Sequence, residues 1–325
     1  MSHLNDMTIV SGRANPDLAE AVAACLQVSL GNLQVFEFSN ENIFVKINES
    51  VRENDVFIIQ SLSTPVNTSI MELLIIIDAA KRASAGRITA VMPYYAYGRT
   101  DKKDQPRVPI TARLIADLIT VAGANRVLTM DLHAGQIQGY FNIPVDELTA
   151  MYVLAEYFKG KRLSEHVVVS TDIGNAKRAR NFAELLDAPL AIVEKRRTGN
   201  ADRAEVLNLI GEVEGKTAIL VDDEIDTAGS ITQAANMVKA YGANDIYACC
   251  THPVLSGPAV ERLRDSPIRE LVVTDTIPLP AEKRLKNMKV LSIASMLAET
   301  IQRIHTGGSV GAIFEADRQS MHDRE

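Results

Sequence analysis

The fold is decided by residues 219–230, which read Ile-Leu-Val-Asp-Asp-Glu-Ile-Asp-Thr-Ala-Gly-Ser. The apolar run ending at Val221 predicts a buried strand, and two acids, Asp222 and Asp223, close it. Asp226 and a turn of small residues, 227–230, then open an amphipathic helix. Backbone N–H groups at a helix start favour a bound anion such as phosphate. The stretch therefore predicts a strand–turn–helix unit with an anion site.

The acids beside this turn need a partner, because carboxylates alone would repel an anion. Sugar hydroxyls or a divalent cation would satisfy them. The alternative is an ordinary acidic turn whose side chains cap a helix. The residues alone leave both interpretations open.

Apolar runs with strand character alternate with helical periods along the whole chain. Helices are expected at 16–30, after the cap Asn15-Pro16-Asp17, and at 70–83 and 110–122. This βαβ alternation predicts an α/β fold with parallel sheets covered on both faces. The two halves look alike, so we expect two similar doubly wound domains that meet near residue 147. The predicted strands are 7–11, 56–60, 87–92, 126–130, 166–170, 190–193, 217–221, 245–249 and 270–273.

Composition excludes several classes of protein. The chain has 325 residues, of which 46% are hydrophobic and 23% charged, as in a globular protein of two domains. The net charge of −7 argues against general binding to nucleic acid or to membrane surfaces. Three cysteines without metal spacing fit a reduced, cytoplasmic protein. No membrane span or signal peptide is predicted.

A second segment, 131–146, reads Asp-Leu-His-Ala-Gly-Gln-Ile-Gln-Gly-Tyr-Phe-Asn-Ile-Pro-Val-Asp. It resembles the motif of the ribose-phosphate diphosphokinase family, class I, and 219–230 resembles that family's phosphoribosyl-diphosphate loop. The resemblance runs from about residue 8 to about residue 314. It implies an enzyme that transfers diphosphate from ATP to ribose 5-phosphate, giving phosphoribosyl diphosphate and AMP for nucleotide, His and Trp biosynthesis.

The resemblance also implies the domain plan and the sugar-phosphate site. Two type I phosphoribosyltransferase-like domains would span 1–147 and 148–314, followed by a polar tail, 315–325, expected to be disordered. Ribose 5-phosphate would be bound by Arg197 and by the acidic loop. The loop's residues in this role are Asp222, Asp223, Asp226, Thr227, Ala228, Gly229 and Ser230.

Asp131 and His133 end the predicted strand 126–130, and strand alternation would place both on one face. Ligands of open α/β sheets bind at that end of the strands. From the residues alone, a histidine satisfied by hydrogen bonds is the simpler interpretation. The resemblance instead implies that His133 is a metal ligand near the ATP phosphates.

Residues 169–180 predict a strand, a polar loop and a basic helix start, and they resemble the family's diphosphate loop. Asp172 would be a second metal ligand, with Mg²⁺ as the cofactor. Two residues depart from the family: Thr171 stands in place of Pro, and Asn175 in place of Gly. Asn tolerates a positive φ better than most residues. An ordinary capped helix with a solvated basic face is the alternative.

A basic triplet, 195–197, follows the predicted strand 190–193. Such a triplet is usually a solvated turn. Here it resembles the family's catalytic loop, in which Lys195 and Arg197 would close over ATP and neutralise charge on the transferred group. Thr198 replaces the family's proline, and the stretch that follows is one residue longer than in bacterial enzymes.

Two segments resemble the family's ATP contacts. In 93–103 these are Arg99, Thr100 and Asp101, with Thr100 in place of Gln. Without the resemblance, this segment is an exposed loop or an interface. In 38–42, which would reach adenine in a neighbouring subunit, they are Phe38, Asn40, Glu41 and Asn42. Asn40 and Asn42 replace acids, and an amide oxygen still accepts a hydrogen bond.

Regulation and assembly are expected from the resemblance alone. It implies a homohexamer that ADP inhibits and inorganic phosphate activates between subunits. Ser309 matches one contributor to that site, whereas Gly311 stands where Ser is common.

Two rival functions stay open. A phosphoribosyltransferase would share 222–230 but needs neither 131–146 nor the basic triplet. A catalytically weak regulatory paralogue is suggested only by Asn40 and Asn42. A near-match to a phosphate-binding P-loop at 211–217 precedes a predicted strand instead of following one, so we interpret it as a turn.

Overall fold

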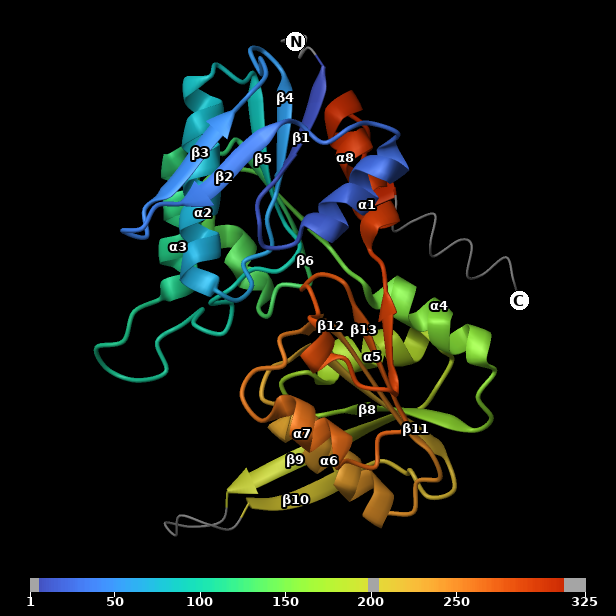
Figure 1. The fold of residues 1–325 in the computed structure, drawn as a ribbon. Helices are drawn as coiled ribbons and strands as arrows, with labels where there is room; N and C mark the ends of the chain where they lie inside the picture. The colour runs from blue at the N-terminus through green and yellow to red at the C-terminus, as the bar shows by residue number, and fades with distance from the viewer. Residues whose placement is uncertain (1–5, 198–204, 313–325) are drawn as a thin grey trace. The chain divides into compact units, whose positions relative to one another are not determined.

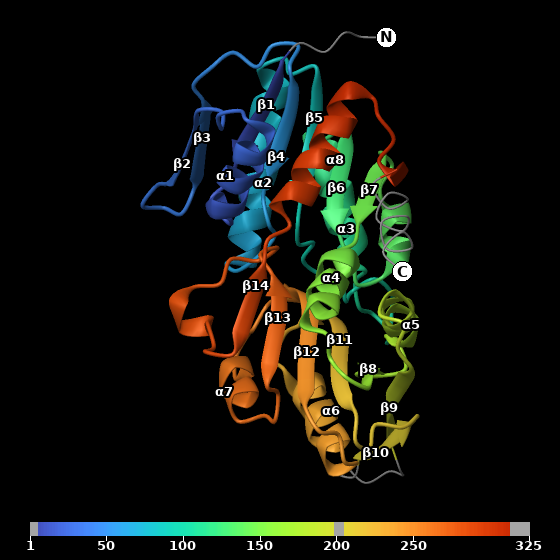
Figure 2. The same cartoon turned by 90° about the vertical axis from the view of Figure 1, so that its right-hand side faces the viewer.

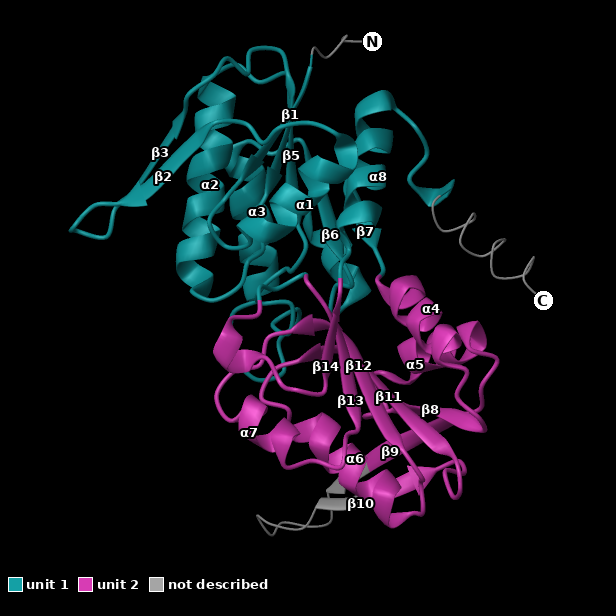
Figure 3. Cartoon of the chain, turned by 45° about the vertical axis from the view of Figure 1, so that its right-hand side comes forward, with its two compact units in different colours: residues 1–149, 276–278, 292–325 teal, residues 150–275, 279–291 magenta. Residues whose placement is uncertain are grey.

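The computed structural model describes residues 6–197 and 205–312, and the chain divides into two compact units (Figure 3). Unit 1 contains the chain up to Thr149, the short segment Thr276–Pro278 and the chain from Ser292 onward. Unit 2 contains Ala150–Asp275 and Leu279–Leu291. The first break lies close to the expected division at 147/148. The segment from Ser292 to 314, which the sequence assigned to the second domain, belongs to unit 1 instead.

Unit 1 is built on a five-stranded sheet in which every pair of neighbours is parallel. Helices α2 (Val66–Arg82) and α3 (Thr111–Ala122) cover one face, and α1 (Pro16–Leu26) and α8 (Ala294–Thr306) pack together on the other (Figure 1). All residues of the internal strand β4 are buried, as expected for a sheet covered on both faces. In spatial order the strands are β1 (Met7–Ser11), β4 (Asp55–Ile59), β5 (Arg87–Met92), β6 (Arg126–Met130) and β7 (Val145–Leu148).

An antiparallel hairpin that the sequence did not predict joins unit 1. It is formed by β2 (Leu33–Glu37) and β3 (Ile43–Ile47), and β3 packs against α2. Its apolar residues are only half-buried, so the strands lack the continuous apolar character by which the other strands were recognised.

Helix α8 is fixed to unit 1 by a buried ion pair. The Asp55 carboxylate is fully buried, and its Oδ1 accepts a hydrogen bond of 2.8 Å from Arg87 Nε. His305 Nδ1 lies 2.9 Å from Asp55 Oδ2, and Arg87 Nη2 also donates to the Ile304 carbonyl at 2.9 Å. A buried carboxylate is stable only with such partners. Two of these three contacts, those made by His305 and by the Ile304 carbonyl, involve α8. They explain why this segment, which is distant in the sequence, completes unit 1.

Unit 2 is built on a seven-stranded sheet, parallel except for the edge strand β10, which pairs antiparallel with β9. Figure 2 shows β11 to β14 side by side in this sheet. Helices α4 (Met151–Lys161) and α5 (Ala176–Leu185) share one apolar core, and α6 (Gly229–Ala240) and α7 (Ala259–Arg264) share another. In spatial order the strands are β10 (Glu205–Ile210), β9 (Leu190–Arg197), β8 (His166–Ser170), β11 (Thr217–Ile225), β12 (Ile246–Pro253), β13 (Glu270–Thr274) and β14 (Met288–Leu291).

The strand order of unit 2 reverses at β8. From β8 the chain moves outward to β9 and β10, and then returns to the other side of β8 for β11. In open α/β sheets, the loops that leave such a switch point form the ligand crevice. Here they are the loops after β8 and after β11, which carry the two motifs at Asp172 and at 226–230.

The predicted α/β class with two doubly wound, largely parallel sheets is confirmed. Two strands are longer than the sequence indicated. β9 continues through the basic triplet to Arg197, because it pairs with β10. β11 continues past Asp222 to Ile225, because β12 extends beside it as far as Pro253. Charged residues thus lie within strands whose neighbours hold them there.

Two smaller expectations concern the rest of the chain. Residues 211–216 form the turn between β10 and β11, as expected, with Gly211 and Gly215 both at positive φ. Within the described ranges, no helix has the length and apolar composition needed to cross a membrane. The tail 315–325 lies outside the described residues.

Candidate active site

The anion turn of unit 2 follows β11. Ala228 takes a left-handed conformation, with φ 60° and ψ 11°, and α6 begins at Gly229. The N-cap residue is Ala228, whose side chain makes no capping hydrogen bond. The N–H groups of a helix's first turn have no partner within the helix and carry the positive end of its dipole. The turn therefore presents backbone donors of the kind that hold a phosphate group.

A neighbouring segment holds this turn in place. Ser256 donates its hydroxyl hydrogen bond to Asp226 Oδ1 and its N–H to the Asp226 carbonyl, the latter at 3.0 Å. Arg262 Nη1 donates to the Thr227 carbonyl at 3.0 Å. A Cβ on Gly229 would lie 3.4 Å from the same Arg262 nitrogen. The anion turn thus has a fixed backbone and an arginine at its rim.

Arg262 was not predicted from the sequence. It lies on the short helix α7, far along the chain from the turn that it contacts. An isolated arginine on a helix is usually solvated, and no pattern around it indicates a site. Only the packing of α7 beside α6 reveals its place.

The acids at the end of β11 are individually partnered. Asp222 Oδ1 accepts the Asp223 N–H at 3.0 Å, and its Oδ2 accepts the Thr171 hydroxyl at 2.6 Å. Asp223 is only 5% exposed, and its Oδ1 lies 3.2 Å from Arg178 Nη1. Thr171 and Arg178 both come from the segment after β8. The two loops of the switch point therefore meet through these carboxylates.

Asp172 is held within its own loop. Its Oδ1 accepts the Asn175 N–H at 2.8 Å, and its carbonyl accepts the Ser170 hydroxyl at 2.7 Å. Asn175 has φ −88°, so the left-handed conformation that its place in the family suggested is not used. Its side-chain amide instead donates to the Val221 carbonyl of β11 at 2.7 Å.

Lys195 and Arg197 lie in β9, where the sequence had placed a loop. Their backbone partners in β10 are Leu207 and Glu205. The predicted catalytic loop that follows, 198–204, lies outside the described residues. The structure thus places the backbone of both cations on an edge hairpin of the unit 2 sheet.

In unit 1, the loops after β5 and β6 come together. A Cβ on Gly98 would lie 3.3 Å from the His133 Cβ, which sets the segment with Arg99 against the 131–146 motif. Asp101 is 5% exposed, and its Oδ2 accepts a hydrogen bond of 2.5 Å from Gln136 Nε2. Tyr140 also donates its hydroxyl to the Asp101 carbonyl. Sequence segments that both resembled ATP and metal contacts are therefore neighbours.

The expected pairing of Asp131 and His133 on one face is wrong. Strand β6 ends at Met130, and Asp131 takes a left-handed φ of 40°. Alternation holds only within a strand, so the two side chains diverge. Asp131 is buried while His133 is exposed.

These arrangements agree with known relatives over nearly the whole chain. The family profile described as the N-terminal domain of ribose phosphate pyrophosphokinase matches residues 7–123, and the phosphoribosyl synthetase-associated domain matches 198–315. A ribose-phosphate pyrophosphokinase from Caldanaerobacter subterraneus is 58% identical over 96% of this chain and 99% of its own. The chain belongs to the ribose-phosphate pyrophosphokinase family.

Other relatives agree. A ribose-phosphate pyrophosphokinase from Bacillus subtilis is 53% identical over 95% of this chain and 97% of its own. The crystal structure of a phosphoribosylpyrophosphate synthetase from Mycobacterium smegmatis has a TM-score of 0.89 at 44% identity, covering 94% of this chain and 100% of that one. Pyrophosphokinase and diphosphokinase name the same enzyme class. The family predicted from the two motifs, and the enzyme class it implied, are confirmed.

The predicted adenine segment forms the tip of the β2–β3 hairpin. Phe38 is 50% exposed and packs edge-on against Phe36, with ring centroids 5.0 Å apart. Asn40 Oδ1 accepts the Asn42 N–H at 3.2 Å, and Glu41 has a left-handed φ of 67°. The exposed ring is presented for stacking, whereas the Asn40 oxygen already closes the turn.

The predicted regulatory residue, Ser309, is also in unit 1. Ser309 is exposed after the end of α8, and Arg303 Nη1 donates to its carbonyl at 3.1 Å. Gly311 lies beside it, with a Cβ position 3.7 Å from the Ser309 hydroxyl. No described contact assigns a ligand to this segment.

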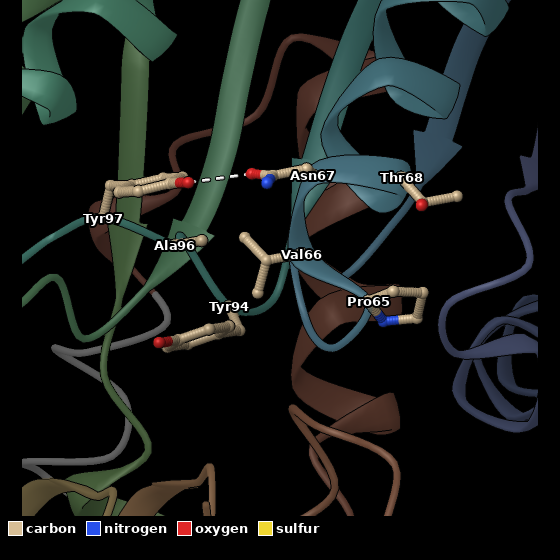
Figure 4. Close-up of a pocket in the computed structure, with 7 residues that line it drawn as sticks. All are labelled: Pro65, Val66, Asn67, Thr68, Tyr94, Ala96 and Tyr97. Atoms are coloured by element: carbon tan, nitrogen blue, oxygen red, sulfur yellow. Dashed lines mark hydrogen bonds between the residues drawn. The ribbon is translucent and has the colours of Figure 1, made fainter.

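A pocket of about 470 Å³ opens near the Arg99 segment of unit 1 (Figure 4). The Tyr97 hydroxyl donates to Asn67 Oδ1 at 2.8 Å across its rim. The pocket gathers none of the predicted ATP-binding residues. Its lining consists of Pro65, Val66, Asn67, Thr68, Tyr94, Ala96 and Tyr97.

The residues present fit a divalent cation by their chemistry. In the described part of the chain, no three His, Cys, Asp or Glu side chains gather into a ready-made metal site. Asp172 and Asp222 nevertheless supply carboxylate oxygens, the donor that Mg²⁺ prefers, and this ion usually keeps water and substrate oxygens as its other ligands.

Proposed function

We propose that the chain transfers the diphosphate group of ATP to the anomeric hydroxyl of ribose 5-phosphate. The products are 5-phosphoribosyl 1-diphosphate and AMP, which would supply nucleotide, His and Trp biosynthesis. The observation that carries this proposal is the match to ribose-phosphate pyrophosphokinases over at least 95% of this chain in the two relatives described.

Ribose 5-phosphate binds, in this proposal, at the anion turn of unit 2. Its phosphate accepts hydrogen bonds from the amides of residues 226–230, where the α6 dipole favours negative charge. The ribose hydroxyls donate to Asp222 and Asp223. These roles are supported by the fixed backbone of the turn and by the carboxylates at the adjoining end of β11.

Charge on the migrating group is the main chemical obstacle. The anomeric oxygen attacks the β-phosphorus, and the hydroxyl proton is released to solvent. The bond from the β-phosphorus to the oxygen that it shares with the α-phosphorus breaks, and this oxygen leaves with AMP. Lys195 and Arg197 offset the negative charge on the β-phosphoryl oxygens, and Arg197 also contacts the sugar phosphate. Phosphoryl-type transfer depends on such positioning and charge neutralisation more than on covalent chemistry.

In this proposal, ATP binds to the loops after β5 and β6 of unit 1 and to the tip of the β2–β3 hairpin. Arg99, Thr100 and Asp101 would contact the nucleotide, and the buried carboxylate of Asp101 would anchor their loop. Phe38 of a neighbouring subunit would stack on adenine, with Asn40, Glu41 and Asn42 around it. The exposed ring of Phe38 supports this role.

Mg²⁺ is proposed as the cofactor, with His133 and Asp172 as protein ligands. The two residues belong to different units, so their joint ligation is part of the proposal. When bound, the cation would neutralise charge on the ATP phosphates.

The proposed assembly, regulation and location depend on the family to which the chain belongs. We expect a homohexamer that ADP inhibits and inorganic phosphate activates, with Ser309 at the regulatory site. A cytoplasmic location fits the unpaired cysteines, of which Cys249 and Cys250 are buried. Burial raises the pKa of both thiols, which leaves them protonated and unreactive near neutral pH.

Phosphorus NMR of the purified protein with ATP, ribose 5-phosphate and Mg²⁺ tests the reaction. We expect AMP and phosphoribosyl diphosphate to form in equal amounts. A phosphoribosyltransferase would instead consume added phosphoribosyl diphosphate in the presence of a base. A regulatory paralogue would form neither product while still binding ATP.

A further inference from the structure

Two side-chain hydrogen bonds join the loop after β8 to the end of β11 within unit 2. Thr171 donates its hydroxyl to Asp222 Oδ2 at 2.6 Å. Asn175 donates its amide to the Val221 carbonyl at 2.7 Å. Both acceptors lie in β11, where the apolar run of the strand ends and its acidic residues begin.

These donors are the two residues at which the loop departs from the family motif that its sequence resembles. The family's proline and glycine at these positions have no side-chain donor, so neither could form these bonds. The two departures therefore supply a connection that the loop's usual residues lack. They look unrelated in the sequence, but they reach adjacent residues of one strand.

The Thr171 bond restricts the Asp222 carboxylate strongly. Thr171 is fully buried, so its hydroxyl loses water and needs a protein partner. A hydroxyl bound to a carboxylate forms one of the stronger hydrogen bonds. The other oxygen, Oδ1, accepts the Asp223 N–H at 3.0 Å. Two donors at two oxygens fix the plane of the carboxylate.

A carboxylate oxygen can accept more than one hydrogen bond, because the two oxygens together offer about four lone-pair sites. A ligand that donates to Asp222 then meets an acceptor that is already oriented, and it does not lose free energy in ordering that side chain.

We propose that Thr171 is a positioning residue that orients Asp222 toward the hydroxyls of the pentose phosphate, and that Asn175 supports it by holding the same loop to β11. This proposal rests on the proposed function, because it assumes that the pentose phosphate binds at the acidic end of β11. Thr171 acts through Asp222 and makes no contact with the substrate itself.

Thr171→Val tests the role, since it keeps the shape of the side chain and removes the donor. We expect the KM for ribose 5-phosphate to rise about ten-fold, equivalent to ~1.4 kcal/mol, while the KM for ATP stays within about two-fold. Thr171→Ser keeps the hydroxyl and should restore the wild-type KM. Asn175→Gly should raise the same KM by a smaller factor.

Thr300→Val is the matched control. Thr300 is also fully buried, but its hydroxyl donates to the Met296 carbonyl within α8 of unit 1 and not to a residue assigned to either substrate. It should lower the melting temperature without changing either KM. An equal rise of both KM values in Thr171→Val, or failure of Thr171→Ser to restore binding, would overturn the proposal.

Calorimetry separates this proposal from the proposed function. Ribose 5-phosphate is titrated into the wild-type protein and into Thr171→Val, without ATP. Weaker binding to the variant supports the positioning role of Thr171, even if the wild type forms no product. Absence of product would refute only the proposed reaction. Equal binding by the folded wild type and the folded Thr171→Val variant refutes the positioning role of Thr171, even if the reaction proceeds.

Discussion

The loop ends of the two sheets are built differently. In unit 2, the predicted ligand residue Asp222 is held by Thr171 of the loop after β8, and Asp223 by Arg178 of helix α5, which follows that loop. In unit 1, the corresponding loops are held by Asp101, whereas the predicted ligand His133 is exposed. At the unit 2 end, the described contacts hold the carboxylates expected to meet the pentose, whereas at the unit 1 end they hold one buried residue, Asp101, of a loop whose neighbour carries an exposed histidine.

This difference suggests that the loop ends of the two sheets bind different substrates. A fixed set of acceptors and amides suits a small ligand of constant shape, such as a pentose phosphate. Exposed side chains on an anchored loop suit a larger ligand that brings its own counter-ion, such as a nucleotide with Mg²⁺. Substitutions at the two ends should therefore affect different substrates.

The largest effect should come from a residue that belongs to neither anchored end. Lys195→Ala should lower kcat by about 10²–10⁴-fold, because a cation that offsets charge in the transition state is lost. Steady-state assay of AMP release measures it. Lys289→Ala, an exposed lysine of β14, is the control and should keep the wild-type rate. Unchanged kcat in Lys195→Ala would rule out its assigned role.

Asp222→Asn should have the next largest effect and should act on the pentose alone. The substitution removes the charge that accepts from Thr171 and from the proposed ribose hydroxyls. A hydrogen bond to a charged group contributes roughly 1.5–3 kcal/mol, so we expect the KM for ribose 5-phosphate to rise about 10- to 100-fold. The KM for ATP is measured in parallel, and an equal rise there would break the contrast between the two ends.

Asp101→Asn is the counterpart in unit 1. It weakens the buried hydrogen bond with Gln136 and so loosens the segment that carries Arg99. We expect the KM for ATP to rise about three- to ten-fold, since one hydrogen bond is weakened and not lost. The pentose KM should stay the same. If the pentose KM rose instead, the assignment of substrates to the two ends would be reversed.

Arg262→Gln should produce the smallest effect. Its guanidinium is exposed and adds charge beside the anion turn, and exposed charge pairs contribute about 0.2–1 kcal/mol. We expect the KM for ribose 5-phosphate to rise about two- to five-fold, and more at low salt, where screening is weaker. Arg264→Gln removes the same charge from the same helix and should leave this KM unchanged. Similar values for the two variants would show only a general charge effect.

The sequence predicted the apolar parts of the strands well and their charged ends poorly. The bounds of β1, β5, β6 and β8 agree with the prediction, because each is an apolar run with polar residues on both sides. The ends of β9 and β11 were missed because they carry charged residues. Their strand conformation depends on the neighbours β10 and β12, which local sequence does not reveal.

In the candidate site, too, local sequence predicted some features and missed others. Motifs that are continuous in sequence, such as 131–146 and 222–230, identified the family. Contacts between distant segments were not predictable, because no local pattern records them. Arg262 at the anion turn and Thr171 on Asp222 both belong to this class. The divergence of Asp131 and His133 likewise depends on one left-handed residue that alternation does not foresee.

The three-part composition of unit 1 has a consequence for biosynthesis. A ribosome releases the chain from its N-terminus, so every segment of unit 2 has been made by Leu291, before α8 exists. Until α8 emerges, Asp55 and Arg87 have neither His305 nor the Ile304 carbonyl as partners, and the inner side of α1 is uncovered. The unit that is begun first is therefore the one finished last, and a message truncated near codon 290 would encode a complete second unit joined to an incomplete first.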